Sequence, residues 1–125
     1  MHELGIMTGV VESVRQAAQE NRADKVLSVS LSVGEMTEAV EDALRFAFEA
    51  LTDRDELMEG ARLDITMIAP RSRCSECGYE FTHDRFHVTC PKCGGFGEII
   101  AGKELRIDSI EVDIPDGDDS PSPSA

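Results

Sequence analysis

Two pairs of cysteines constrain this chain more than any other feature. The segments C-S-E-C-G, residues 74–78, and C-P-K-C-G, residues 90–94, each place two thiols three residues apart and follow them with glycine. Glycine allows the tight turn that points backbone N–H groups at the sulfurs. Four thiolates in this pattern fill a tetrahedral site and leave no coordination position for a substrate. We therefore predict a closed, structural metal site formed by Cys74, Cys77, Cys90 and Cys93.

Zinc is the metal that we expect in this site, although the cysteine spacing does not separate zinc from iron. A rubredoxin-like iron centre has the same four-thiolate geometry, so an electron carrier is one alternative function. Two other interpretations of the cysteines are disfavoured. Disulfides would require an oxidising compartment, which nothing in the sequence suggests. A thioredoxin-like redox pair requires a single C-x-x-C at the start of a helix, whereas this chain has two such pairs. We interpret His83 and His87, between the two pairs, as loop residues rather than a second metal site.

The charge of the chain is distributed unevenly over its 125 residues, a length that suits one ordinary domain or a small domain with an inserted module. Residues 71–95 hold four basic and three acidic side chains, so this segment has a charge of +1 and the remainder carries −14. A strongly acidic body argues against phosphate backbones as ligands. A zinc-ribbon nucleic-acid-binding or transcription accessory protein is a second alternative function, and this charge counts against it.

The N-terminal region lacks the apolar core of a signal peptide, and no apolar run approaches the ~20 residues that span a bilayer. We therefore expect a cytoplasmic protein. No nucleophile with an adjacent base, no pair of catalytic carboxylates and no phosphate-binding loop is recognisable, so we do not expect an enzyme.

Two amphipathic helices are predicted in the first half of the chain. Residues 4–20 repeat apolar side chains at steps of three and four. A second helix should follow a Thr37 cap, with acidic residues where the helix dipole favours negative charge. Phe46 is interpreted as a core residue. The expected buried stripes are Leu4, Met7, Val11, Val14 and Ala18 in the first helix, and Val40, Leu44, Ala47, Phe48 and Leu51 in the second.

Three strands are predicted, at residues 25–33, 61–69 and 103–114. The first should place Leu27, Val29, Leu31 and Val33 on the core face. The last changes phase midway, and a bulge at Asp108–Ser109 would keep its apolar residues on one face. The two strands that flank the cysteines should pair with each other in antiparallel fashion.

The predicted fold class is α+β: a small three-stranded sheet with two helices, plus a four-cysteine zinc-ribbon module inserted between the last two strands. The domains should be an α/β domain of residues 1–69 and 98–114, a zinc ribbon of residues 70–97, and a disordered acidic Pro/Ser tail at 115–125. The ribbon is too short to form a core without its metal, so chelation should unfold it. Its aromatic residues should shield the sulfurs and pack against the body: Tyr79, Phe81, Phe86 and Phe96.

The first three residues, M-H-E, offer a second set of metal ligands. The Met1 α-amine, the His2 imidazole and the amide nitrogens of His2 and Glu3 can surround one ion in a plane. Square-planar nitrogen donors suit Ni(II) or Cu(II), whereas zinc prefers a tetrahedron. Taken alone, a histidine at position 2 is most often an ordinary exposed residue.

Several segments form an ordered pattern over residues 1–114: M-H-E-L, A-L-R-F-A-F-E-A-L, E-G-A-R-L-D-I, the two C-x-x-C-G turns and K-E-L-R-I-D-S-I-E-V. Together they are similar to the HypA/HybF family of nickel metallochaperones. The resemblance implies structural zinc on the four cysteines and transient nickel at Met1, His2 and Glu3. It also implies delivery of nickel to the large-subunit precursor of nickel-iron hydrogenase, with a HypB-type GTPase as partner. In some bacteria such proteins also serve urease.

The departures from the family pattern are small. Gly5 stands where family members often carry serine, and the acidic tail is not part of the pattern. We therefore predict a nickel carrier, monomeric or weakly homodimeric, that binds neither nucleic acid nor membranes. Its flexible terminus should hold nickel loosely, while the zinc ribbon serves as scaffold and docking surface.

Overall fold

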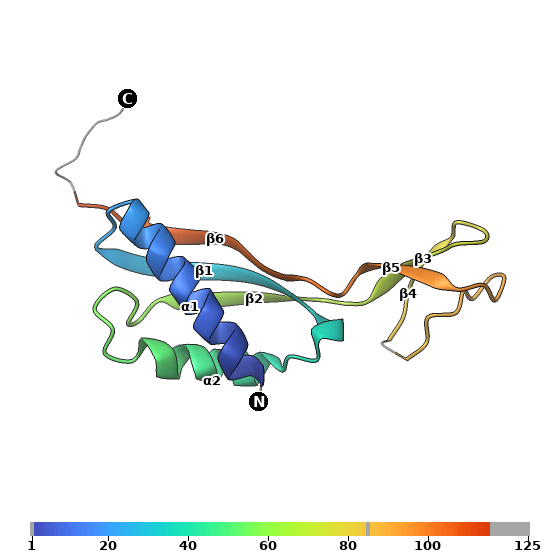
Figure 1. Ribbon diagram of the computed structural model, residues 1–125, viewed down its shortest axis with the longest axis horizontal. Helices are drawn as coiled ribbons and strands as arrows, with labels where there is room; N and C mark the ends of the chain where they lie inside the picture. The colour runs from blue at the N-terminus through green and yellow to red at the C-terminus, as the bar shows by residue number, and fades with distance from the viewer. Residues whose placement is uncertain (1, 85, 116–125) are drawn as a thin grey trace, which may run out of the picture. The chain divides into compact units, whose positions relative to one another are not determined.

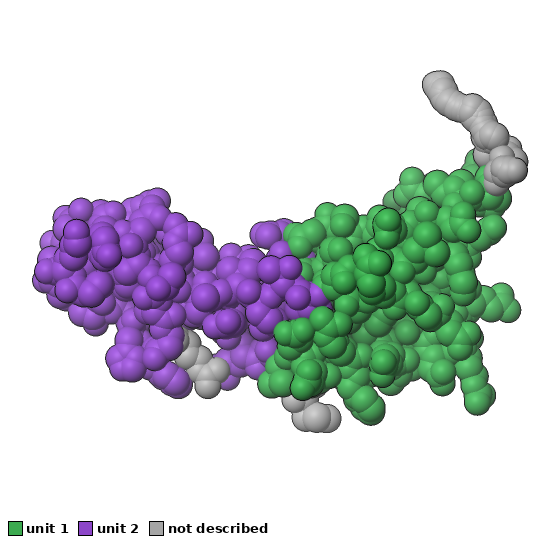
Figure 2. Space-filling model, turned by 180° about the vertical axis from the view of Figure 1, so that it is seen from behind, with its two compact units in different colours: residues 1–31, 40–64, 107–125 green, residues 32–39, 65–106 purple. Residues whose placement is uncertain are grey.

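The computed structural model describes residues 2–84 and 86–115, and contacts between residues divide the chain into two compact units (Figures 1 and 2). Unit 1 comprises residues 1–31, 40–64 and 107–125, and unit 2 comprises residues 32–39 and 65–106. The elements in chain order are α1 (His2–Glu20), β1 (Lys25–Gly34), the 3-10 turn η1 (Glu35–Thr37), α2 (Glu41–Thr52), β2 (Arg62–Ile68), β3 (Arg71–Cys74), β4 (Glu80–Thr82), β5 (Gly97–Ala101) and β6 (Leu105–Asp113).

Two three-stranded sheets organise these elements, with strand orders β2-β1-β6 and β4-β3-β5. Each strand of the first sheet has residues in unit 1, which also contains both helices. The second sheet is formed by strands that lie between β2 and β6 in the sequence, in the segment that carries the cysteines. This arrangement confirms the predicted fold class. The predicted domain division, with residues 70–97 as a separate module, stays a prediction. The predicted disordered tail lies outside the described residues except for Pro115.

The first sheet has β1 at its centre, so the prediction that β2 and β6 pair with each other was wrong. In unit 1 the Asp24 N–H donates to the Asp113 carbonyl at 2.8 Å, and the Ser28 hydroxyl donates to the Glu111 carboxylate at 2.9 Å, so β1 and β6 run antiparallel. Serines 28 and 32 of β1 are buried together with its apolar residues. Because successive side chains of a strand point to opposite faces, both faces of β1 are covered at these positions.

The alternation of β1 begins later than its sequence indicates. Leu27 was expected on the core face but is 48% exposed, whereas Val26 before it is buried. Val29, Leu31 and Val33 are buried as predicted, although Ser32 between them is buried as well. The sequence does not reveal which of these two neighbours faces the core, because Val26 and Leu27 are both apolar.

The phase change predicted for β6 is visible in its burial. Ile107 and Ile110, on either side of Asp108–Ser109, are both half-buried, as is Val112. Leu105 and Ile114 were expected on the same face, but they are 49% and 48% exposed. These two residues lie at the ends of the strand, where fewer neighbouring side chains cover the sheet.

Helix α1 contributes the largest apolar stripe of unit 1. Met7, Val10, Val11, Val14 and Ala18 are buried, and α1 packs against α2. The prediction for Leu4 was wrong, because Leu4 is 50% exposed and Glu3 takes the buried position instead. Residues three and four apart share one helix face, so Glu3 belongs to the stripe of Met7 and Val10.

The cap of helix α2 lies three residues after the predicted one, and the helix begins at Glu41. Thr37 ends η1, where its hydroxyl donates to the Gly34 carbonyl at 2.8 Å, so it does not cap α2. The cap position is Val40, which is 57% exposed rather than buried. Leu44, Ala47 and Phe48 are buried as predicted, but Phe46 is 73% exposed and the prediction that it lies in the core was wrong.

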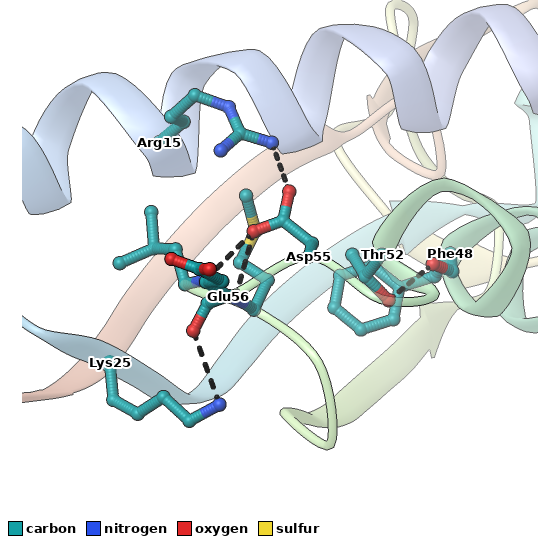
Figure 3. Close-up of polar contacts among 8 residues, drawn as sticks. Arg15, Lys25, Phe48, Thr52, Asp55 and Glu56 are labelled. Carbon is teal, nitrogen blue, oxygen red and sulfur yellow. Dashed lines mark hydrogen bonds and ion pairs between the residues drawn. The ribbon is translucent and has the colours of Figure 1, made fainter.

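A polar network fixes the segment that follows α2 (Figure 3). The Asp55 carboxylate accepts a hydrogen bond from Arg15 of α1 and further bonds from the backbone N–H groups of Leu57 and Met58. The Arg15 bond is the largest cause that lowers the pKa of Asp55 below its ordinary value of 3.8. Lys25 of β1 donates to the Glu56 carbonyl at 3.3 Å. The segment is thereby attached to both α1 and β1.

The second sheet consists of short strands that the sequence pattern did not reveal. β3 pairs antiparallel with β4, where Arg71 lies opposite Thr82, and with β5, where Ser72 lies opposite Ile99. Arg71 and Arg73 both form ion pairs with Glu80 of β4. Strands of three to five residues are too short for a periodicity signal.

Candidate metal centres

The two cysteine pairs adopt the same backbone turn. In the first, the Gly78 N–H donates to the Cys74 carbonyl at 3.0 Å, and in the second the Gly94 N–H donates to the Cys90 carbonyl at 2.9 Å. Gly78 and Gly94 have φ angles of +79° and +78°, which L-residues with side chains rarely adopt. The structure thus confirms the tight turns expected from the glycine after each pair.

The four sulfurs converge on a common point. Cys74 Sγ lies 3.4 Å from Cys93 Sγ, Cys77 Sγ lies 3.7 Å from Cys90 Sγ, and all four sulfurs lie within 4.8 Å of one another. Tetrahedral zinc with Zn–S bonds of ~2.3 Å requires sulfurs about 3.8 Å apart. Within residues 2–84 and 86–115, these four cysteines form the one cluster of metal-ligating side chains. The donor set therefore fits a four-coordinate thiophilic ion.

Backbone N–H groups stabilise negative charge on the first cysteine. The Cys77 N–H lies 3.5 Å and the Glu76 N–H 3.3 Å from Cys74 Sγ, and these bonds, that of Cys77 first, lower the pKa of Cys74 to about 6. A bond from Gly95 acts in the same direction on Cys93, but the neighbouring Cys74 and burial outweigh it and raise the pKa of Cys93 to about 12. Four thiolates therefore need a cation to coexist, and metal uptake must release protons.

The aromatic residues near the cysteines divide into a buried and an exposed group. Phe81 is buried in one cluster with two of the ligand cysteines, and the Tyr79 ring stacks over it at 6.3 Å. Phe86 and Phe96 are 73% and 82% exposed. The expectation that all four aromatic residues shield the sulfurs and pack inward was therefore wrong for Phe86 and Phe96, and Tyr79 is also exposed, at 38%. Phe81 alone fills the small core beside the ligands.

The two histidines between the pairs have different polar partners. His83 Nε2 lies 2.7 Å from the hydroxyl of Ser72, which is fully buried. His87 is exposed, and its Nδ1 lies 2.8 Å from the Asp84 carboxylate. Neither belongs to the metal cluster found among the described residues. Their interpretation as loop residues without a second ion stays a prediction.

The N-terminal residues are placed at the start of α1, except for Met1, which lies outside the described residues. His2 is exposed, and Glu3 is 6% exposed. The Glu3 carboxylate accepts a hydrogen bond from the Val40 N–H at 2.9 Å, the largest cause that lowers the pKa of Glu3 to about 2. The backbone N–H groups of His2 and Glu3 lie in the first turn of α1, where the helix itself provides no hydrogen-bond acceptor for them.

This role of Glu3 was not predicted from sequence. Its side chain fixes the first turn of α1 to the start of α2. The available signal was the helical spacing, because Glu3 lies four residues before Met7 on the buried stripe.

Comparison with known proteins decides the family. The family described as "Hydrogenase/urease nickel incorporation, metallochaperone, hypA" matches residues 1–112. The chain belongs to the HypA family. It is accordingly a nickel metallochaperone for hydrogenase maturation and not an enzyme, as predicted.

Relatives cover the chain almost completely. The hydrogenase maturation factors HypA of Geobacter metallireducens and Geotalea uraniireducens are 42% and 41% identical over 114 residues, 90% of this chain and 100% of each relative. The solution structure of the Ni metallochaperone HypA from Helicobacter pylori matches with a TM-score of 0.66 at 25% identity, covering 92% of this chain and 100% of that one. Among the described helices, none has the length and apolarity needed to span a membrane.

Proposed function

We propose that this chain binds one Ni(II) ion at Met1, His2 and Glu3 and delivers it to the large-subunit precursor of nickel-iron hydrogenase. The family match carries this proposal, because it begins at the first residue and so includes the three proposed ligands. The exposed imidazole of His2 and the amide groups of the first turn supply nitrogen donors, which suit planar Ni(II). The Met1 amine completes the set.

Zinc is the ion that we propose for the four cysteines, with a structural role. A site with four thiolate ligands is closed, so an ion held there is not offered to a recipient. The distances between the sulfurs agree with zinc, and iron in a rubredoxin-like site has the same geometry. Metal analysis distinguishes them: we expect a colourless protein with one zinc per chain, and stoichiometric iron would contradict the assignment.

Acid should release the nickel. The proposed ligands must be deprotonated, and the unperturbed pKa values are ~7.7–8.0 for an α-amine and ~6.5 for imidazole. Nickel affinity should therefore fall as the pH drops through this range, whereas the cysteine site keeps its ion. A carrier with this property can load at neutral pH and needs no covalent change to release its cargo.

The partners that we propose follow from family membership. They are a HypB-type GTPase and the hydrogenase precursor, with urease maturation as a second destination because the family description names both enzymes. We place the protein in the cytoplasm, as a monomer or weak homodimer without nucleic-acid or membrane partners. The high negative charge of the chain, −13, supports the exclusion of nucleic acids and anionic membranes.

Calorimetric nickel titration of the zinc-loaded protein tests the terminal site. The native chain should bind one Ni(II), whereas His2→Ala and a form extended by residues before Met1 should each lose that binding. His87→Ala is the matched control, since it removes another exposed imidazole and should leave the titration unchanged. Unchanged nickel stoichiometry in both terminal variants would contradict the proposed site.

A further inference from the structure

Helix α2 carries more apolar surface than its core requires. Ala43, Phe46, Ala47 and Ala50 recur at steps that place them on one face of the helix. Of these, only Ala47 is buried, while Phe46 is 73% exposed and Ala50 is exposed as well. The buried residues Leu44 and Phe48 belong to a different part of the circumference. α2 therefore presents a second apolar stripe.

This stripe forms a groove with the first turn of α1. Leu4, which is 50% exposed, faces it together with Glu3, and the hollow so enclosed measures about 310 Å³. We call the residues Leu4, Ala43, Phe46, Ala47 and Ala50 the Phe46 groove. The alanines provide a shallow floor and Phe46 a protruding wall. A floor of small side chains between two helices allows a further helix to approach closely.

An acidic flank borders the Phe46 groove. Phe46 and Ala50 also line a second, wider hollow of about 620 Å³, to which Glu49, Asp53 and Glu59 contribute three carboxylates. Neither hollow is lined by any described lysine or arginine. Glu49 and Asp53 form no ion pair with any residue that the structure describes. Their charges are therefore available to a ligand.

We propose that the Phe46 groove and its acidic flank are a docking surface for an amphipathic, cationic helix of a partner protein. The apolar face of such a helix would cover Phe46 and the alanines, as helix-in-groove recognition requires. Lysine or arginine side chains along one edge would lie against Glu49 and Asp53. Charge complementarity of this kind increases the association rate and selects among partners.

Charge also disfavours three other molecules or segments that could cover this surface: a second copy of the chain, its own C-terminal residues and an anionic lipid surface. A second copy of the chain brings a net charge of −13. The C-terminal residues Asp116, Asp118 and Asp119 are acidic, with no basic residue after them. Anionic lipid surfaces carry the same sign. Each would bring like charges to the acidic flank, at a cost in free energy that a cationic helix avoids.

The test uses two synthetic helical peptides with the same Leu/Ala face, one with a lysine flank and one with a glutamate flank. Fluorescence anisotropy measures their binding to the full-length, zinc-loaded protein. The lysine peptide should bind with an affinity that falls as salt is added, and the glutamate peptide should bind at least about tenfold more weakly. Phe46→Ala should weaken the lysine peptide about tenfold or more, because an exposed aromatic anchor is lost.

Matched variants separate this surface from a general effect. Phe86→Ala removes an aromatic ring of equal exposure, 73%, in unit 2, and should leave peptide binding unchanged. Glu49→Lys with Asp53→Lys should weaken the lysine peptide several-fold and flatten its salt dependence, whereas Glu98→Lys in unit 2 should not. The same variants should titrate with nickel like the native protein, which keeps this test distinct from that of the terminal site.

Three outcomes would overturn the proposal. The first is no binding of the lysine peptide at about millimolar concentration. The second is equal binding of both peptides, or equal loss with Phe46→Ala and Phe86→Ala. The third is self-association of the native chain that Phe46→Ala abolishes, which would assign the Phe46 groove to a second copy.

Discussion

The helical unit and the cysteine-bearing segment are held together by different means. Unit 1 buries large side chains from two helices, a strand and a loop, including Met7, Leu44, Val29 and Met58. Around the four cysteines the buried apolar cluster contains Phe81 and two of the metal ligands themselves, Cys74 and Cys90. A region with so little apolar burial depends on its metal for cohesion. We therefore expect the chain to contain one region stabilised by packing and one stabilised by coordination of the proposed metal.

Removal of the cysteine-bound metal should have the largest effect. In zinc-finger peptides the metal contributes ~10–16 kcal/mol, far above what the Phe81 cluster can supply. Chelation, or Cys90→Ser, should collapse the NMR dispersion of the residues around the cysteines while the helical circular dichroism of unit 1 persists. Ser75→Ala, between two ligands, should leave both signals intact. Persistent dispersion in the metal-free protein would remove the distinction between the two regions.

Truncation in the helical core should show the opposite pattern. Leu44 is fully buried, so Leu44→Ala should lower the free energy of unfolding by about 2–5 kcal/mol through lost burial and a cavity. Chemical denaturation followed by circular dichroism measures this loss, and metal content should stay at one ion per chain. Leu27→Ala, at a half-exposed position, should cost far less. Loss of the metal from Leu44→Ala would show that the regions are not independently stabilised.

The Asp55 network should contribute a smaller, pH-dependent stability. Asp55→Ala should cost about 2 kcal/mol at neutral pH, because a charged acceptor is removed from Arg15 and two backbone N–H groups. The pKa of Asp55 is lowered in the folded state, so its contribution is complete above 3.8 and is lost as the pH falls through and below that value.

Denaturation of the native chain and Asp55→Asn as a function of pH checks the sign. The difference in the free energy of unfolding should be greatest at neutral pH and shrink in acid. A difference that grows on acidification would refute the assigned role of the carboxylate.

The smallest effect on stability is expected at Phe46. Phe46→Ala should change the free energy of unfolding by no more than about 0.5 kcal/mol, because most of its surface is already exposed. Phe48→Ala, two residues further along α2 but buried, should cost about 3–5 kcal/mol. Thermal denaturation of the two variants compares them directly. A large loss at Phe46 would mean that the ring supports the fold rather than a partner surface.

The cysteine turns were the most predictable part of the molecule because their information is local. Ligand type, spacing and the following glycine fix a turn and a donor set without reference to distant residues, and the structure places all four sulfurs together. The helices were predictable in position for a related reason, since their apolar periodicity extends over several turns. The N-terminal ligand set was predictable only through the resemblance to a family.

Long-range pairing was the part that sequence could not specify. No local sequence pattern indicates that β1 lies between β2 and β6, or that Val26 rather than Leu27 is buried. The exposure of Phe46 has the same origin, because aromatic character predicts burial only on average. Glu3 was missed because its acceptor role depends on a backbone N–H group 37 positions away.

The bond between Glu3 and Val40 also has a consequence for synthesis. The three residues proposed to carry nickel leave the ribosome first, yet the group that holds Glu3 in place is translated 37 positions later. The cargo end of the nascent chain therefore cannot adopt its final conformation until the start of α2 has emerged. The proposed nickel site is therefore complete only in chains whose synthesis has passed the start of α2.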